Sequence, residues 1–431
     1  MKSILMISLH GYVGANPELG KPDTGGQVVY VLELAERFSR LGKRVDLVTR
    51  QFEDQPEYDN VHENYSVWRI PFGGKKFIRK EDMHDHLKAF VTNTLAAIKK
   101  ENKKYDVVYS HYWDAGWAGQ KIAEELGISH VHTPHSLGWW KQHSMGSDMD
   151  EKEMEKTYRF KERIRKEYFV YQMCNHIVAT TLPQVDLLTQ QYDVLSKNCT
   201  MIPPGIDENR FYPVPSKEND KIRAKYDIQP TDILALGRMA HNKGYDLLIR
   251  ALPTVFELCP EARLVAAIGG DQSEQDDKGV AGLKKLAKEL GGVLDRITWK
   301  NYIADEDLAN VYRAANIFVM PSRYEPFGMV AIEAMACGTP SVVTVHGGLY
   351  DLIDFGNQAL FADPHRPTEF GAMMPCLYYI LKCEMSYLWK VLVLLDVILD
   401  GQVLPNVCCK YLQVLSVKTP WNLICFINRN S

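Results

Sequence analysis

Two glutamates eight residues apart, Glu325 and Glu333, are the most informative chemical feature of the sequence. Between them, Pro326 and Gly328 predict a turn that opens a helix, so Glu325 lies in the loop and Glu333 more than one turn into the helix. The first N–H groups of such a helix have no partner inside it and attract anions and hydroxyl groups. Two carboxylates near these N–H groups suit the hydroxyls of a ribose and a hexose. The alternative, two solvated glutamates, fits poorly because apolar residues 334–336 follow Glu333.

Two further loops carry groups suited to a phosphate. The segment Asp23-Thr24-Gly25-Gly26-Gln27 follows an apolar run, and its glycines let backbone N–H groups approach an anion where a helix begins. Arg238 and Lys243 share a loop after another apolar run and could neutralise a departing diphosphate. The alternatives are an ordinary turn and two solvated surface cations. The position of Arg238 directly after an apolar run favours phosphate binding for its loop, whereas the Asp23 loop by itself leaves both alternatives open.

Alternating apolar runs and helical segments predict the scaffold that positions these loops. Pro203-Pro204-Gly205 interrupts the series, and a polar stretch to about residue 230 is typical of a linker. In parallel sheets of this kind, ligands bind beyond the carboxyl ends of the strands, where all three motifs fall. The sequence therefore predicts an α/β fold with two Rossmann-like domains facing a cleft. The expected strands are residues 4–8, 45–49, 106–110, 130–133, 177–180 and 201–202 in the first domain, and 233–236, 264–268, 297–299, 317–320 and 341–344 in the second.

Length and composition exclude several other classes of protein. A chain of 431 residues favours two domains, and a formal net charge of −4 gives no electrostatic case for nucleic acid as a partner. No apolar run approaches the roughly 20 residues that span a bilayer, so no membrane association is expected. The apolar N-terminus is read as a first strand and not as a signal peptide, which favours a cytoplasmic protein. Nine cysteines without a CxxC pair fit reduced thiols, so no metal site is expected.

The segment from Glu325 to Glu333 resembles the E-x7-E motif of retaining glycosyltransferases with the GT-B fold, the large group that includes sucrose synthase and glycogen synthase. Within that group, the chain resembles family 4. The resemblance covers about residues 1–372. Motifs that recur in the same order in sucrose-phosphate synthases are Thr24-Gly25-Gly26-Gln27-Val28-Val29-Tyr30, Arg69-Ile70-Pro71-Phe72-Gly73-Gly74, His111-Tyr112-Trp113-Asp114, His135-Ser136-Leu137-Gly138, Ile202-Pro203-Pro204-Gly205 and Arg238 with Lys243. Motifs that are closer still to mannosylfructose-phosphate synthases are Gly11-Tyr12-Val13, Phe52-Glu53-Asp54-Gln55-Pro56, His132-Thr133-Pro134-His135 and Val345-His346-Gly347-Gly348-Leu349.

This resemblance implies a binding site for a nucleotide-sugar donor. Arg238 and Lys243 are expected to hold the diphosphate, Glu333 the ribose, and Glu325 the sugar. His135 is expected to lie over the donor sugar beside the reacting carbon. The implied donor-binding set is Gly26, Arg238, Lys243, Glu325, Phe327, Gly328, Met329 and Glu333, and the implied catalytic set is His135, Arg238, Lys243 and Glu325.

The resemblance also implies a sugar-phosphate acceptor, fructose 6-phosphate, which requires cations in an otherwise acidic protein. The matching positions are Gly25, Gln27, Lys80, Lys141 and Arg163. The motifs contain no carboxylate placed as a nucleophile, so the implied mechanism is substitution on one face of the sugar, with the leaving diphosphate taking the acceptor proton. Because the phosphate loops lack an Asp-x-Asp metal motif, neither a metal nor another cofactor is expected to be required.

Three functions remain open from the sequence. The first is transfer of mannose from GDP-mannose to fructose 6-phosphate, giving mannosylfructose phosphate, and the second is sucrose-phosphate synthesis from UDP-glucose. The third, of another class, is an impaired protein that binds sugar nucleotides without turnover.

That third possibility arises from the C-terminal residues, which depart from the family pattern. Residues 376–431 carry five cysteines and few charges, without a clean helical or strand period. We therefore divide the chain into an acceptor-binding domain (1–215), a nucleotide-sugar-binding domain (216–372) and an atypical tail (373–431). The tail is typical of out-of-frame translation or of a disordered segment.

Overall fold

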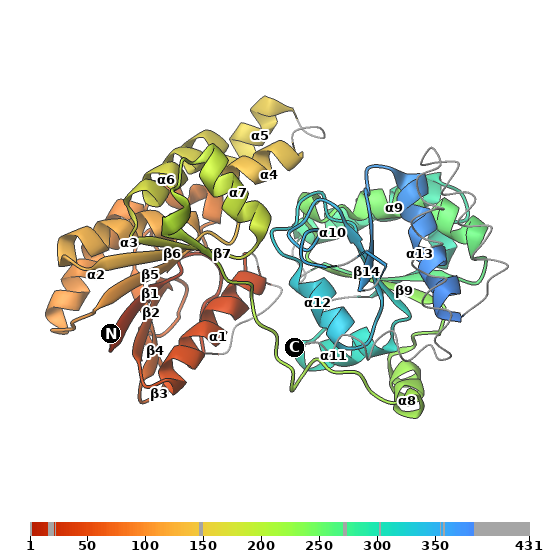
Figure 1. The fold of residues 1–431 in the computed structure, drawn as a ribbon, viewed down its shortest axis with the longest axis horizontal. Coiled ribbons are helices and arrows are strands. Elements are labelled where there is room, and N and C mark those ends of the chain that lie inside the picture. Colours follow the sequence, from red (N-terminus) through yellow and green to blue (C-terminus); the bar gives the residue numbers. More distant parts are fainter. Residues whose placement is uncertain are drawn as a thin grey trace. The chain divides into compact units, whose positions relative to one another are not determined.

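The computed structural model describes residues 2–15, 21, 23–145, 150–269, 274–300, 303–353, 355–356 and 358–382. The chain separates after Pro204 into two compact units (Figure 1), each of which is described by itself. The boundary expected after residue 215 thus falls inside the second unit.

The first unit contains an eight-stranded sheet in the order β3-β4-β2-β1-β5-β6-β7-β8. Every neighbouring pair is parallel except β3 and β4, which form an antiparallel edge. Sequence analysis missed this edge because β3 is largely exposed and lacks an apolar pattern. The strands are β1 (Ser3–Ile7), β2 (Arg44–Gln51), β3 (Tyr58–His62), β4 (Tyr65–Pro71), β5 (Val107–His111), β6 (Ser129–Thr133), β7 (His176–Ala179) and β8 (Cys199–Met201).

Helices cover both faces of this first sheet. Successive residues of β1 point to opposite sides, so Ile4 and Met6 pack in the cluster that includes α1, while Leu5 and Ile7 pack with α2 and α3. Both sides of β1 are therefore buried, which explains its unbroken apolar sequence. The helices are α1 (Gly26–Arg40), α2 (Leu87–Lys100), α3 (Tyr112–Leu126), α4 (Gly138–Met145), α5 (Glu151–Tyr158), α6 (Phe160–Met173) and α7 (Leu182–Gln191).

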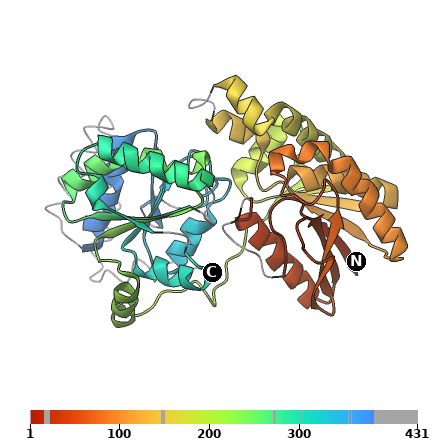
Figure 2. The ribbon, with the colours of Figure 1, turned by 180° about the vertical axis from the view of Figure 1, so that it is seen from behind.

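The second unit repeats this architecture with a six-stranded sheet in the order β11-β10-β9-β12-β13-β14. All neighbouring strands are parallel. Helices α9, α10 and α13 cover one face and α11 and α12 the other; Figure 2 shows the layers from behind. The strands are β9 (Asp232–Gly237), β10 (Arg263–Ile268), β11 (Ile297–Lys300), β12 (Ile317–Met320), β13 (Ser341–Thr344) and β14 (Ala359–Ala362), and the helices are α8 (Ser216–Tyr226), α9 (Tyr245–Leu258), α10 (Glu274–Glu289), α11 (Asp305–Ala314), α12 (Met329–Ala336) and α13 (Pro367–Lys382).

Helix α13 corrects the expectation that an atypical tail begins at residue 373. The helix continues to Lys382, and residues 372–374 and 376–379 are part of the buried core. It lies so close to α9 that a Cβ on Gly371 would be 2.5 Å from the carbonyl oxygen of Ala251. The apolar residues that seem unpartnered in the sequence are thus covered by α9 and the sheet. The remainder of the tail, residues 383–431, lies outside the described residues.

Candidate active site

In the second unit, the loops after β9 and β12 meet through an ion pair. Lys243 Nζ lies 2.6 Å from Glu325 Oε2, and the hydroxyl of Ser322 donates to the same oxygen at 3.3 Å. Both side chains of the pair are mostly buried. The structure thus brings together two residues that the sequence placed in separate motifs, 82 residues apart.

Further bonds hold these two loops in register. The amide of Arg323 donates to the carbonyl oxygen of Asn242 at 2.9 Å, and the Asn242 side chain donates to the carbonyl oxygen of Tyr324 at 3.2 Å. The Arg323 guanidinium also forms two 2.7 Å bonds with Asp246 at the start of α9. At the turn itself, Gly244 has a φ of +67°, and a Cβ there would lie 2.0 Å from the carbonyl oxygen of Pro321. Only glycine fits this close approach.

Gly244→Ala should therefore lower the free energy of unfolding by about 2–3 kcal/mol, because it adds a clash with Pro321 to the cost of a positive φ. Gly42→Ala is the matched control, since Gly42 has a φ of +75° with open space where a Cβ would stand. We expect the control to lose about 1 kcal/mol. Urea unfolding of both variants measures the difference, and equal losses would show that the loop can move away from Pro321 without cost.

The turn and helix predicted between the two glutamates are present. Gly328, with a φ of +110°, caps α12, and Glu333 lies in the helix. Within the described chain, the backbone N–H groups of residues 327–330 donate no recorded hydrogen bond and remain available for a ligand. Glu333 accepts a 3.0 Å bond from the hydroxyl of Tyr312. Burial raises the pKa of Glu333 despite this bond and the nearby positive charge of Arg210.

Arg238 directly follows β9, and its side chain is partly exposed. Its charge acts on Tyr245: burial and the carboxylate of Glu325 raise the pKa of this tyrosine, while Arg238 lowers it. The hydroxyl of Tyr245 is buried without a hydrogen-bond partner among the described residues. A Cβ on Gly237 would lie 2.6 Å from it. Tyr245 is therefore a candidate site residue that sequence analysis missed, because an aromatic residue at a helix start is usually part of the core.

In the first unit, His135 lies in the loop after β6 and bonds to a second imidazole. Its Nε2 is 3.1 Å from Nδ1 of His111, and its ring meets the ring of Tyr30 edge-on at 4.9 Å. Burial, with a contribution from the charge of His10, lowers the pKa of His135 to about 3. Burial also lowers the pKa of His111 well below its usual value. Both imidazoles are thus neutral near pH 7, and His135 is held at a φ of +58° that non-glycine residues rarely adopt.

His10 is a second site residue that sequence analysis missed. Its Nδ1 lies 2.9 Å from the carboxylate of Asp114, and both side chains are buried. Although His111 and Asp114 are close in the sequence, Asp114 bonds to His10 and His111 bonds to His135. The only available signal was the position of His10 just after a predicted strand.

The cations expected at an acceptor phosphate gather near the start of α1. Lys80 forms an ion pair with Asp23, two residues before Gly25. Burial alone would raise the pKa of Asp23, but the charges of Lys80 and His10 hold it well below its usual range. Lys141 lies over the ring of Tyr158, at 4.4 Å from its centroid. Burial and the neighbouring charges of Lys80 and Arg163 lower the pKa of Lys141 from 10.5 to about 7.

The side chains of Gln27 and Arg163, both expected at the acceptor, differ in the hydrogen bonds that they donate within the protein. The side-chain amide of Gln27 lies 3.5 Å from Ser8, at the carboxyl end of β1. The Arg163 guanidinium is bound to Glu167 at 2.7 Å, to the hydroxyl of Tyr112 at 2.9 Å and to the carbonyl oxygen of Ser136 at 2.8 Å. These bonds, all buried or nearly so, support the loop that carries His135.

Two α/β units with largely parallel sheets have the architecture of glycosyltransferases of the GT-B fold. Residues 24–210 match the family described as Glycosyltransferase Family 4, and residues 217–374 match Glycosyl transferases group 1. The chain belongs to glycosyltransferase family 4, and it is a hexosyltransferase.

Individual relatives agree with this assignment. The chain is 51% identical to mannosylfructose-phosphate synthase of Agrobacterium fabrum over 374 residues, which cover 86% of the chain and 82% of the relative. It is 33% identical to D-inositol 3-phosphate glycosyltransferase of Corynebacterium jeikeium, with 85% and 86% covered. The structure of sucrose-phosphate synthase from Thermosynechococcus elongatus matches with a TM-score of 0.75 at 26% identity, covering 91% of this chain and 92% of that one. In the part of the chain that the structure describes, no helix is long and apolar enough to cross a membrane.

Proposed function

We propose that this hexosyltransferase moves mannose from GDP-mannose to fructose 6-phosphate with retention of configuration, giving mannosylfructose phosphate. The observation that carries the proposal is the pairing of Lys243 with Glu325 beside the open N-terminus of α12, in a chain half identical to a mannosylfructose-phosphate synthase. When the donor binds, this ion pair would separate, so that Lys243 binds the diphosphate and Glu325 accepts hydrogen bonds from the sugar hydroxyls.

Each donor group has a proposed partner on the second unit. Arg238 and Lys243 bind the diphosphate, which is favourable because two cations face two phosphates. The amides of residues 327–329 bind the sugar at the helix N-terminus. Glu333 accepts hydrogen bonds from the ribose, and Gly26 of the first unit also belongs to the proposed donor set. The hydroxyl of Tyr312 fixes the Glu333 carboxylate for this role.

In the proposed reaction, the bond between C1 of the hexose and the diphosphate oxygen breaks as the acceptor hydroxyl attacks from the same face. The acceptor proton passes to the leaving diphosphate oxygen, so charge and atoms balance without a separate base. Arg238 and Lys243 stabilise the negative charge that develops on the leaving group. A neutral His135 is suited to hydrogen bonding with the sugar and not to carrying a positive charge. The proposed chemistry requires neither a metal nor another cofactor.

The acceptor is proposed to bind on the first unit, with its phosphate near Lys80 and Lys141 and its sugar near Gly25 and Gln27. Lys80 is already paired with Asp23, whereas Lys141 has no recorded ion pair among the described residues. Lys141 is therefore the cation with the most to gain from a phosphate. Arg163 remains in the proposed acceptor set, although its recorded bonds lie within the protein.

Binding of fructose 6-phosphate at pH 8 should be accompanied by uptake of a proton. Lys141 is mostly neutral at pH 8, since its pKa is about 7, and a phosphate dianion beside it raises that pKa. Affinity for the acceptor should accordingly fall as pH rises from 7 to 9. Calorimetry in two buffers of different ionisation enthalpy measures the proton count. Lys141→Met should abolish the uptake, and an unchanged count in that variant would remove Lys141 from the acceptor site.

A second donor, UDP-glucose, is favoured by the structural likeness to sucrose-phosphate synthase. A third possibility, binding of sugar nucleotides without turnover, rests on the unusual composition of residues 376–431, of which residues 383–431 lie outside the described residues. We also propose a cytoplasmic location, since the described cysteines, Cys174, Cys199, Cys259, Cys337 and Cys376, are all free thiols.

The test is release of nucleoside diphosphate from GDP-mannose and from UDP-glucose, each with and without fructose 6-phosphate. The proposal expects GDP release that depends on the acceptor, with the α-anomeric configuration of the donor preserved in the product by NMR. Acceptor-dependent release of UDP alone would make the chain a sucrose-phosphate synthase. Binding of either donor without release would make it an inactive binding protein.

A further inference from the structure

Three metal-ligating side chains meet at one edge of the second sheet, outside the site described above. His346 follows β13, and Asp363 and His365 follow β14. These strands are parallel neighbours, with Thr344 opposite Ala362 in the register. Their carboxyl ends therefore place the two loops side by side, although His346 and Asp363 are 17 positions apart in the sequence. His346 belongs to the motif Val345-His346-Gly347-Gly348-Leu349, but no motif indicated that it meets Asp363 and His365.

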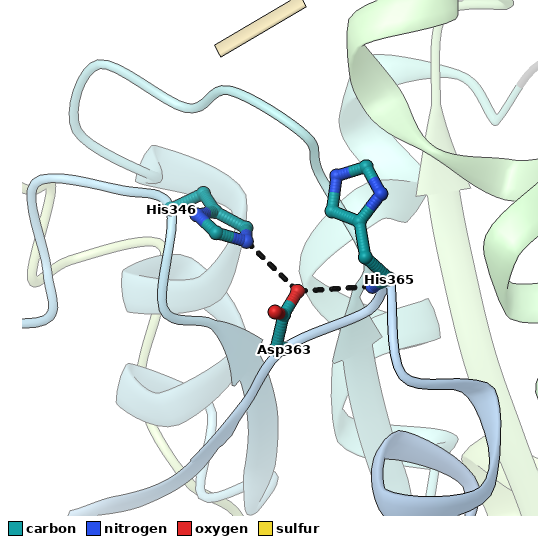
Figure 3. A group of neighbouring side chains, drawn as sticks. All are labelled: His346, Asp363 and His365. Atoms are coloured by element: carbon teal, nitrogen blue, oxygen red, sulfur yellow. Dashed lines mark hydrogen bonds and ion pairs between the residues drawn. The ribbon is translucent and has the colours of Figure 1, made fainter. Parts of the chain in front are cut away.

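The three side chains converge on one small volume. His346 Nε2 lies 2.8 Å from Asp363 Oδ1, and Figure 3 shows the two imidazole rings on either side of the carboxylate. One ligand atom from each residue lies within 4.8 Å of the others. Bonds of about 2.0–2.2 Å to a common ion bring such atoms to roughly 3.4 Å apart in tetrahedral geometry. The side chains are only partly buried, so a small rotation of each would close that gap.

Backbone bonds orient the cluster. The amide of His365 donates to Asp363 Oδ1 at 3.0 Å, and the amide of His346 donates to the hydroxyl of Thr344 at 3.0 Å. Hydrogen-bonded carboxylates and fixed ligand loops are typical of protein metal sites. The loops thus hold the ligands on one side of a volume that stays partly open to solvent.

We propose that His346, Asp363 and His365 form a binding site for a divalent transition-metal ion such as Zn²⁺. Two imidazole nitrogens and one carboxylate oxygen suit ions of this class, whereas Mg²⁺ and Ca²⁺ prefer oxygen ligands alone. Three protein ligands leave at least one position for water or a solute. The three proposed ligands are not among the proposed donor or acceptor residues, so the ion site does not depend on which donor or acceptor binds.

The metal site has a direct connection to Glu325. The carbonyl oxygen of His346 accepts a bond from the amide of Glu325 at 3.1 Å, and the amide of Gly348 donates back to the carbonyl oxygen of Glu325 at 3.1 Å. An ion that fixes His346 therefore also fixes the backbone of Glu325. Its effect on the enzyme would be on loop order, not on the bond-breaking step.

Titration of the metal-free full-length protein with Co²⁺ tests the proposal, because visible absorption bands report bound Co²⁺ and a near-ultraviolet band marks thiolate ligands. The chain has nine cysteines, so a thiolate band identifies binding elsewhere. We expect one Co²⁺ equivalent without a thiolate band, displaced by Zn²⁺. His346→Ala and His365→Ala should each lower the affinity for this Co²⁺ ion by about tenfold or more.

His176→Gln removes an imidazole from the first unit and should leave the affinity for this one Co²⁺ ion unchanged. A rise in melting temperature with Zn²⁺ in wild type, absent in His365→Ala, gives a second readout that does not depend on activity. Far-ultraviolet circular dichroism separates loss of a ligand from loss of fold. The proposal is wrong if the His346→Ala and His365→Ala variants remain folded and bind Co²⁺ like wild type, or if only thiolate-bound Co²⁺ appears.

Discussion

Replacing Arg238 with alanine should lower kcat/KM by about 10²- to 10³-fold and leave the melting temperature almost unchanged. The guanidinium is proposed to stabilise negative charge on the departing diphosphate, and that charge is greatest in the transition state. Arg238 is partly exposed and no bond from it to the protein is recorded among the described residues, so its removal should cost little stability. Steady-state kinetics with GDP-mannose and fructose 6-phosphate, combined with thermal unfolding, measures both effects.

Arg250→Ala is the matched control for this experiment. Arg250 is an exposed arginine on α9 in the same unit, and its loss should change neither kcat/KM nor the melting temperature appreciably. If Arg238→Ala retained near-normal turnover, Arg238 would not be a leaving-group ligand. A parallel loss of activity and of stability would instead make it a structural residue of the loop.

The second large effect is expected on stability. Arg163→Met should lower the free energy of unfolding by about 3–5 kcal/mol, because it leaves the Glu167 carboxylate buried without its cation. Glu167 is fully buried and Arg163 is almost so, and their ion pair is 2.7 Å long. Glu167 also accepts bonds from the amide of Gly138 at 2.9 and 3.0 Å. The pair therefore supports both ends of the His135-Ser136-Leu137-Gly138 loop.

Urea unfolding of Arg163→Met alongside Lys161→Met measures this loss. Lys161 is an exposed cation on the same helix, α6, so its variant controls for removal of a positive charge. The proposed acceptor role of Arg163 adds a second expectation, a higher KM for fructose 6-phosphate in Arg163→Met. A nearly unchanged free energy of unfolding, whatever the KM, would contradict the structural role.

Most of the fold could be predicted because buried parallel strands are recognisable in the sequence as short apolar runs. The run at residues 4–8 became β1 (Ser3–Ile7), and the helix expected at about residues 27–41 became α1 (Gly26–Arg40). The edge pair β3–β4 could not be predicted in the same way. An edge strand buries little, so Tyr58–His62 carries no apolar pattern. Strand β14 (Ala359–Ala362) was missed because its sequence, Ala-Leu-Phe-Ala, has no β-branched residue and two alanines, which are uncommon in strands.

The candidate site was predictable in its motifs but not in its contacts. Loop and helix positions of Glu325 and Glu333 follow from local turn residues, and the structure has both. The ion pair of Lys243 with Glu325 and the bond between His10 and Asp114 join residues 82 and 104 positions apart. Nothing local specifies such pairs, because the sheet topology decides which loops meet. The cluster proposed to bind a metal ion was missed for the same reason, since it depends on the pairing of β13 with β14.

The burial of α13 has a consequence for biosynthesis. A helix with apolar side chains on nearly every side must be enclosed, and Phe370, Met374 and Tyr378 fill the core that β9 and α9 begin. During translation, the first unit can fold as soon as Pro204 has left the ribosome. The second unit waits for the last turn of α13, a delay on the order of ten to forty seconds at typical elongation rates. From the synthesis of α9 until α13 is complete, α9 keeps an apolar face uncovered, so we expect this nascent chain to bind chaperones that recognise hydrophobic surface.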